Sequence, residues 1–281
     1  MTRMDRRALF TSGAAAALLV ASGLSAATPR AGGRLRLALS HDGDSFDAVT
    51  RGALFDTLTE VAPNGVLRGE LATDWQGSSD ARSWEFELRP DAAFHDGTRF
   101  GALDVIASLA AQGRFSDTRI LRSEALNHTR VRFELSAPDP DLPYLLADPS
   151  LVIRPKGPQT QDGLPVGTGL YRATRLQPGR HFLGRRVDRH YKDGQAGWFD
   201  SLEITVIPDP AVRAEALRDG FVDVAELPLP EGLRGRGEFF YHPSANQMAL
   251  AAHSGVGVPR VIGARGALDD GRIAQRWWMA A

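Results

Sequence analysis

Alternating apolar and polar residues mark the strands of this chain, because successive side chains of a strand point to opposite faces of a sheet. Residues 34–40 carry Leu35, Leu37 and Leu39 at every second position. The same alternation, or a short apolar run, predicts further strands at 84–88, 131–135, 151–155, 170–176, 180–186, 202–208 and 221–226. The strands 170–176 and 180–186 are predicted to pair around a turn at Pro178-Gly179.

Apolar residues at helical spacing predict four helices between these strands. They cover residues 52–60, 101–112, 140–147 and 208–220. In the last helix, Pro210 suits the first turn and Gly220 suits the end. Strand, helix and strand in succession over 202–226 are typical of a βαβ unit, which predicts a parallel pair of strands in an α/β lobe. Beyond residue 226 the pattern weakens, and an irregular segment is predicted.

The first 27 residues differ in character from the rest of the chain. Arg3, Arg6 and Arg7 precede an apolar run rich in Ala and Gly, and the small residues 25–27 follow it. This order predicts a secretory signal peptide rather than a frayed helix, and the run is too short for a membrane span of about 20 apolar residues. Export by the Tat or the Sec route stays open, since the twin-arginine pattern matches only loosely. We expect a periplasmic protein that is not membrane-embedded.

Composition and charge argue against several classes of function. The formal net charge is -1 and the basic residues are scattered, so no nucleic-acid partner is predicted. The chain has no cysteine, which excludes disulfides and a catalytic thiol. Its seven histidines lack metal-site spacing, and no G-x-S-x-G motif is present, so no metal, cofactor or catalytic group is predicted. A calcium loop starting at Asp42 fails at the required glycine and glutamate positions, which hold Asp47 and Ala53.

The trio His95-Asp96-Gly97 allows two interpretations. It could supply a metal ligand or a general base, but the sequence offers His95 no partner for that chemistry. It also has the composition of a turn, because Gly accepts positive φ and Asp can hydrogen-bond to its own backbone. We therefore interpret the trio as a turn, and we expect His95 to be a hydrogen-bonding residue of the scaffold, away from the ligand.

Residues 70–105 resemble the signature region of the family 5 solute-binding proteins of peptide, dipeptide, oligopeptide and nickel ABC importers. The matching positions are Leu71, Ala72, Trp75, Trp84, Phe86, Leu88, Arg89, Phe94, His95, Asp96, Gly97, Asp104 and Val105. Segments 32–47, 165–180 and 201–226 resemble further family elements in the expected order. Residues 267–280 look like a helix that, in the family, leads toward a closing lobe, so the resemblance implies that this lobe is largely missing.

The resemblance implies a mixed α/β fold. It comprises a lobe like that of type II periplasmic binding proteins, with a smaller α+β domain inserted into it. The implied domains are a signal peptide at 1–27, a first lobe at 28–50 and 165–226, an inserted domain at 51–164, and an irregular C-terminal segment at 227–281.

The resemblance also implies that the protein binds a peptide or similar small solute without chemistry and presents it to ABC permease subunits. The implied ligand-binding residues are Ser40, His41, Asp42, Ser45, Phe46, Thr168, Gly169 and Tyr171. The alternative for these residues is that they only cap strands. For the whole chain, two alternatives remain: a degenerate relative that acts as a protein-interaction or sensor module, and a homodimer that rebuilds the cleft from two copies.

Overall fold

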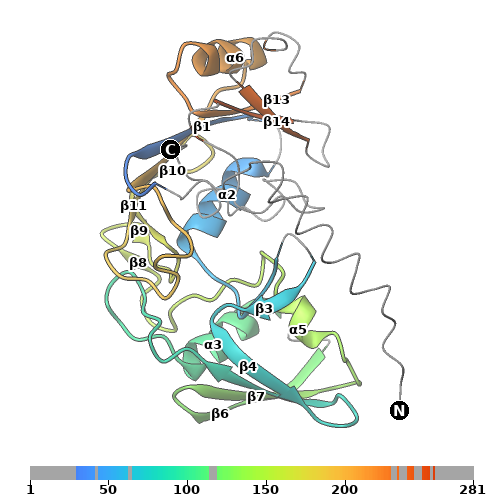
Figure 1. Ribbon diagram of the computed structural model, residues 1–281. Helices are drawn as coiled ribbons and strands as arrows, with labels where there is room; N and C mark the ends of the chain where they lie inside the picture. Colours follow the sequence, from blue (N-terminus) through green and yellow to red (C-terminus); the bar gives the residue numbers. More distant parts are fainter. Residues whose placement is uncertain are drawn as a thin grey trace, which may run out of the picture.

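The computed structural model describes residues 30–41, 44–62, 65–113, 119–228, 233, 239–243, 249–253 and 256. The predicted signal peptide at 1–27, the segment 267–280 and Asp42 lie outside these residues. Two main sheets occupy the upper and lower parts of Figure 1, with helix α2 (Ser45–Leu54) between them.

The larger sheet has seven strands in the order β10-β11-β12-β1-β13-β15-β14. Strand β1 is central and pairs in parallel with β12 on one side and with β13 on the other, while the remaining pairs are antiparallel. The strand bounds are β1 Arg34–Leu39, β10 Tyr171–Gln177, β11 His181–Arg186, β12 Ser201–Val206, β13 Val224–Leu227, β14 Phe239–Pro243 and β15 Ala249–His253. The predicted hairpin of β10 and β11 is confirmed, and Gly179 adopts φ +64° in its turn.

Helix α6 (Pro210–Arg218) forms the predicted βαβ crossover from β12 to β13. Its N-cap Asp209 accepts a hydrogen bond from the Ala211 backbone N–H (2.8 Å), and Gly220 takes φ +75° just beyond its end. The two strands are parallel as predicted, but they are not neighbours. Strand β1 lies between them, because a helix-long connection can cross one intervening strand.

Arg213 anchors helix α6 from inside the molecule. Its side chain is buried at 2% exposure and donates from Nε to the Glu226 carbonyl (2.6 Å) and from Nη1 to the carbonyls of Ile207 and Pro208 (2.5 and 2.8 Å). These carbonyls stand near the carboxyl ends of β12 and β13. The arginine therefore satisfies strand-end carbonyls that would otherwise be buried without a donor.

Helix α2 corrects one prediction of the sequence. The helix begins at Ser45 and ends at Leu54, whereas the predicted range was 52–60, and residues 59–61 form strand β2 instead. The apolar spacing of Phe46, Val49 and Ala53 was obscured because the polar residues before them have the composition of a turn. These three side chains pack into the core of the larger sheet with the inward residues of β1 and β12.

The second sheet has four antiparallel strands in the order β4-β5-β7-β6. Their bounds are β4 Ala72–Gly77, β5 Ser83–Leu88, β6 Ile120–Asn127 and β7 Arg130–Leu135. The predicted strands at 84–88 and 131–135 are confirmed as β5 and β7. Helix α3 (Ala102–Ala111) and the short α5 (Leu142–Leu145) agree with two predicted helices, and α3 packs Val105 and Leu109 onto Phe86 and Phe133 in a separate core.

Two other predictions fail. Residues 151–155 do not form a strand, although Leu151, Val152 and Ile153 are buried as predicted. Ile153 donates one backbone hydrogen bond to the Asp56 carbonyl, and a strand would need a ladder of such bonds. The segment after residue 226 is not wholly irregular, since β15 and β14 extend the larger sheet. Two small hairpins complete the described chain: β2 Thr59–Val61 with β3 Leu67–Gly69, and β8 Thr160–Gln161 with β9 Leu164–Pro165.

Buried charges join the two parts of the molecule. The Lys192 ammonium, 12% exposed, lies 2.5 Å from Glu70 Oε1 and 3.6 Å from Glu60 Oε2, and both carboxylates are almost fully buried. Tyr191 donates its hydroxyl to the same Glu70 oxygen (2.7 Å). Glu60 and Glu70 lie on the way from α2 to the four-stranded sheet, whereas Lys192 follows β11. The ion pairs therefore fix the position of one sheet against the other.

No helix in the described part of the chain has the length and apolar character needed to span a membrane.

Candidate functional site

The first group of predicted ligand-binding residues lies at the carboxyl ends of β1 and β13. The buried Glu226 of β13 accepts a hydrogen bond from the Ser40 backbone N–H (2.9 Å) and another from the Ser45 hydroxyl (2.8 Å). One carboxylate therefore fixes both ends of the loop that enters α2. Ligands commonly bind outside the carboxyl ends of parallel strands, which is where this loop lies.

The side chains of this group have different environments. His41 is exposed, whereas Ser40 is buried and Phe46 packs into the core at 5% exposure. Glu226 was missed by the sequence analysis. The signal that could have identified it is an acidic residue inside the apolar stretch Val224–Leu227, because a carboxylate is buried only when donors satisfy it.

The second group of predicted residues lies at the opposite end of α2. The Gly169 N–H donates to the Leu54 carbonyl (2.9 Å), at the C-terminus of the helix, and a Cβ at Gly167 would stand 2.0 Å from the same carbonyl oxygen. Both glycines are needed because the backbone of 167–169 lies directly on the helix end. The structure therefore does not bring Thr168 and Gly169 together with Ser40 and Ser45.

Tyr171 lies in the core of the larger sheet. Its side chain has no exposed surface, and its hydroxyl donates to the Phe199 carbonyl (3.1 Å). Burial raises the pKa of the phenol well above its ordinary value, so the hydroxyl stays protonated and serves as a donor. In this position Tyr171 stabilises the start of β10.

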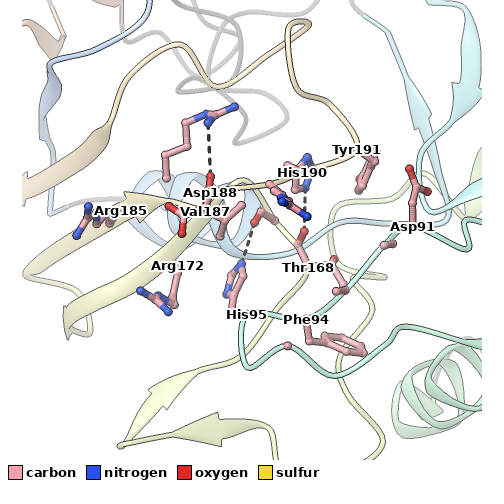
Figure 2. Close-up of a pocket in the computed structure, with 16 residues that line it drawn as sticks. Asp91, Phe94, His95, Thr168, Arg172, Arg185, Val187, Asp188, His190 and Tyr191 are labelled. Carbon is pink, nitrogen blue, oxygen red and sulfur yellow. Dashed lines mark hydrogen bonds between the residues drawn. The ribbon is translucent and has the colours of Figure 1, made fainter.

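His95 and His190 hold two consecutive carbonyls of the glycine-rich segment, as Figure 2 shows. His95 Nε2 lies 2.8 Å from the Gly169 oxygen, and His190 Nε2 lies 2.9 Å from the Thr168 oxygen. The Gly167 N–H donates to His95 Nδ1 (3.3 Å), which makes Nε2 the protonated nitrogen of a neutral ring. Burial lowers the pKa of His95, mainly by desolvating the charged form, and thereby favours this neutral state.

The turn interpretation of His95-Asp96-Gly97 agrees with this geometry. Asp96 Oδ1 accepts hydrogen bonds from the backbone N–H (2.9 Å) and hydroxyl (2.7 Å) of Thr98, and Gly97 adopts φ +87°. Both ring nitrogens of His95 are occupied by backbone groups of 167–169. His95 therefore joins the turn of one part of the molecule to the glycine-rich segment of the other.

A cavity that the sequence analysis missed lies between α3 and residues 150–159. Its volume is about 340 Å³, and its polar lining comprises Ser108, Gln112, Ser150, Arg154, Lys156 and Gln159. Ser108 Oγ donates to the Arg154 carbonyl (3.0 Å) and accepts from the Arg154 backbone N–H (2.8 Å). Asp104 accepts from the Lys156 backbone N–H (2.8 Å), so the wall of the cavity is fixed at two points.

Arg154 is the dominant charged group of this cavity. Its guanidinium is half buried and stacks over the Phe55 ring, with Cζ 4.4 Å from the ring centre. Burial, with a smaller effect from the nearby Arg51, lowers the pKa of Arg154 from its ordinary value. Among the described residues no carboxylate forms an ion pair with it. A half-buried guanidinium without a counter-charge is electrostatically prepared to receive an anionic group.

Metal binding has little support from the described residues. No group of three or more His, Cys, Asp or Glu side chains in that part of the chain could hold a metal ion. The polar groups that line the cavity are hydroxyls, amides and cations.

Comparison with known proteins places this architecture in a family. A sequence model described as "Bacterial extracellular solute-binding proteins, family 5 Middle" matches residues 66–236, more than half of the chain. The chain belongs to this family. Its fold is the mixed α/β fold of type II periplasmic binding proteins.

Curated relatives include transport and regulatory proteins. The chain is 30% identical over 261 residues to a probable peptide ABC transporter periplasmic-binding protein of Sinorhizobium fredii, covering 80% of this chain and 49% of that protein. It is also 32% identical over 163 residues to the HTH-type transcriptional regulator SgrR of Yersinia enterocolitica, covering 56% of this chain and 28% of the regulator.

Solved structures agree with the fold. The peptide-bound DppA of Helicobacter pylori has a TM-score of 0.68 and 25% identity over 77% of this chain and 51% of its own. NikZ of Campylobacter jejuni, in complex with Ni(L-His), has a TM-score of 0.64 and 26% identity over 75% and 48%. The chain thus spans about half the length of the relatives that it matches.

Proposed function

We propose that this protein is the periplasmic solute-binding component of an ABC importer, and that it binds a peptide or similar small solute through an anionic group of that solute. Family membership supports solute binding, and the name of the Sinorhizobium relative supports a peptide. The observation that carries the proposal is Arg154, a half-buried guanidinium that lines a cavity and has no carboxylate partner among the described residues. A peptide carboxylate is a counter-charge of matching geometry.

A thermal-shift screen with paired peptides tests this proposal. Each di- or tripeptide is offered as the free acid and as the C-terminal amide, so that only the carboxylate differs. Ligand that binds the folded state stabilises it by RT ln(1 + [L]/Kd), about 2.7 kcal/mol at a hundredfold excess over Kd. We expect the acids to raise the melting temperature more than the amides do.

The variant Arg154→Met keeps an unbranched apolar side chain and removes the guanidinium, with its charge and its stacking over Phe55. We expect it to abolish the difference between acid and amide, while Arg180→Ala, an exposed arginine in the β10–β11 turn, keeps that difference. An equal response to acids and amides in the unaltered protein would contradict the role of Arg154. No stabilisation by any peptide at millimolar concentration would contradict peptide binding itself.

A second candidate function is favoured by the match to the SgrR regulator. We infer that the same fold could serve here as a sensor or protein-interaction module instead of delivering solute to a permease. Pull-down from periplasmic extract distinguishes the two functions. Recovery of ABC permease subunits favours the importer, whereas recovery of a different, ligand-dependent partner without permease subunits favours the sensor.

A further inference from the structure

A second cavity lies between the β10–β11 hairpin and the turn at residues 91–97, and it carries an excess of guanidinium groups. Its volume is about 470 Å³, and Figure 2 shows the residues that line it. Its charged lining residues are Arg172, Arg185, Arg186, Arg189, Asp91 and Asp188. Asp193 neutralises Arg186, so if both lining carboxylates offset one further arginine each, one positive charge remains. The cavity shares no lining residue with the one that contains Arg154.

Three of the four arginines have no counter-charge in contact. Arg186 pairs with Asp193 (2.6 Å), but within the described chain Arg172, Arg185 and Arg189 form neither an ion pair nor a side-chain hydrogen bond. Arg172 and Arg185 also face each other directly in the register of β10 and β11. Like charges opposite each other destabilise a hairpin, so this pair carries a repulsion that an anion bound between them would relieve.

Thr168 supplies an independent observation at the same cavity. It is 2% exposed, and its Oγ1 is buried without a hydrogen-bond partner among the described residues. Its carbonyl is already taken by His190. Buried hydroxyls are normally hydrogen-bonded, so this one is an unused donor, and rotation of the side chain toward the cavity would offer it to a ligand with acceptor oxygens.

We propose that this cavity is a second binding site, which takes a small multivalent oxyanion of the phosphate or dicarboxylate class. The exposed Arg172, Arg185 and Arg189 supply the positive charge in the fork geometry that suits such oxyanions. Thr168 donates its hydroxyl after its side chain rotates toward the cavity. The cavity adjoins His95 and His190, which hold the two parts of the molecule together. Oxyanion binding therefore strengthens the contact between the hairpin and the turn.

Calorimetric titration of the whole protein with sodium phosphate and with sodium succinate tests the proposal. Sodium chloride at matched ionic strength is the control for non-specific screening of charges by salt. The variants are Arg172→Gln and Arg185→Gln, and the matched control is Arg175→Gln, an exposed arginine of β10 that does not line the cavity. We expect saturable binding, roughly tenfold weaker in each of the two variants and unchanged in the control, because each variant removes a charge-assisted hydrogen bond.

A fourth variant, Thr168→Val, separates ligand binding from folding. The hydroxyl has no partner to lose, so we expect the variant to keep its melting temperature but to bind the oxyanion several-fold more weakly. Saturable binding of phosphate alone assigns the site to phosphate, and binding of succinate alone assigns it to dicarboxylates. A response equal to that of sodium chloride would overturn the proposal, and so would full binding by Arg185→Gln. Phosphatidylglycerol vesicles are titrated in parallel, and binding to them without any binding of free phosphate or succinate would also overturn it. Because the Arg154 cavity is separate, these outcomes do not depend on the peptide test.

Discussion

His95 suggests a catalytic or metal-binding role in the sequence, but in the fold its side chain bonds to the backbone of a distant segment. Its two ring nitrogens bond to backbone groups of Gly167 and Gly169, and its pKa is lowered chiefly by burial. The unfolded chain, by contrast, protonates a histidine near its ordinary pKa of about 6.5. Below that pH the unfolded state binds more protons than the folded state does, so the contribution of His95 to stability is complete above pH 6.5 or so and is lost as the pH falls.

In the variant His95→Gln, the free energy of unfolding should therefore fall less steeply as the pH is lowered. We expect it to unfold more easily than the unaltered protein at pH 8, by about 1–3 kcal/mol for the lost buried hydrogen bonds, with the difference shrinking toward pH 5. Urea denaturation between pH 5 and pH 8 measures this. The exposed His128→Gln is the control. If the free energies of unfolding of His95→Gln and of the unaltered protein change with pH in parallel, His95 does not contribute to the loss of stability in acid.

Arg154 marks the limit of prediction at the residue scale. The sequence places it at the end of an apolar run before Pro155, which indicates a strand end and nothing more. Its role depends on contacts with Ser108 and Phe55, which are distant in sequence, and on burial that no local pattern encodes. Ser40 and Ser45 were predicted only through a family resemblance. Both residues are held by Glu226, which lies 186 residues after Ser40 and 181 residues after Ser45 in the sequence, so no local pattern could predict the contact.

Regular elements could be predicted where the apolar period is unbroken. Strands β5, β7, β11 and β12 alternate cleanly, and each agrees with a predicted strand. Strand β10 was also predicted, although its pairing shifts register between Ala173 and Arg175. Strands β4 and β6 were missed because, unlike β10, neither contains an alternating apolar run, and their pairing contains register shifts, between Ala72 and Asp74 in β4 and at two places in β6. An irregularity of this kind puts successive apolar residues out of step, so the alternation that identifies a strand is lost.

Helix α6 gives a test at the scale of an element. One of its two buried residues is charged: beside the apolar Leu217, Arg213 donates to the carbonyls of Ile207, Pro208 and Glu226. Replacing it by Ala leaves several buried carbonyls without these donors, so we expect a loss of about 3 kcal/mol or more in the free energy of unfolding. Arg218→Ala, at the exposed end of the same helix, should change stability by less than about 0.5 kcal/mol. Equal losses from the two variants in urea denaturation would contradict the anchoring role.

At the scale of the whole molecule, the order of the elements did not reveal how the two sheets are held together. Hydrophobic patterning predicts each core, and the structure has separate apolar clusters for the two sheets. The contact between them includes polar groups from both parts: His95 and His190 hold the glycine-rich segment, and Lys192 faces Glu60 and Glu70. Polar contacts between distant segments leave no periodic signal, which is why this joint could not be predicted.

Lys192 therefore tests whether the two sheets unfold as one unit. Removing one partner of a buried ion pair typically costs about 3–5 kcal/mol, so Lys192→Met should destabilise the protein strongly, while the exposed Lys156→Met should not. The chain has five tryptophans, of which Trp75 and Trp84 belong to the four-stranded sheet. The test therefore uses a background in which the other three, Trp198, Trp277 and Trp278, are replaced by Phe, so that fluorescence reports the four-stranded sheet while circular dichroism reports both sheets. We expect the two signals to coincide in the unaltered protein and to separate in Lys192→Met, because loss of the joint uncouples two self-contained cores. Coincident transitions in the variant would show that apolar contacts alone keep the sheets together.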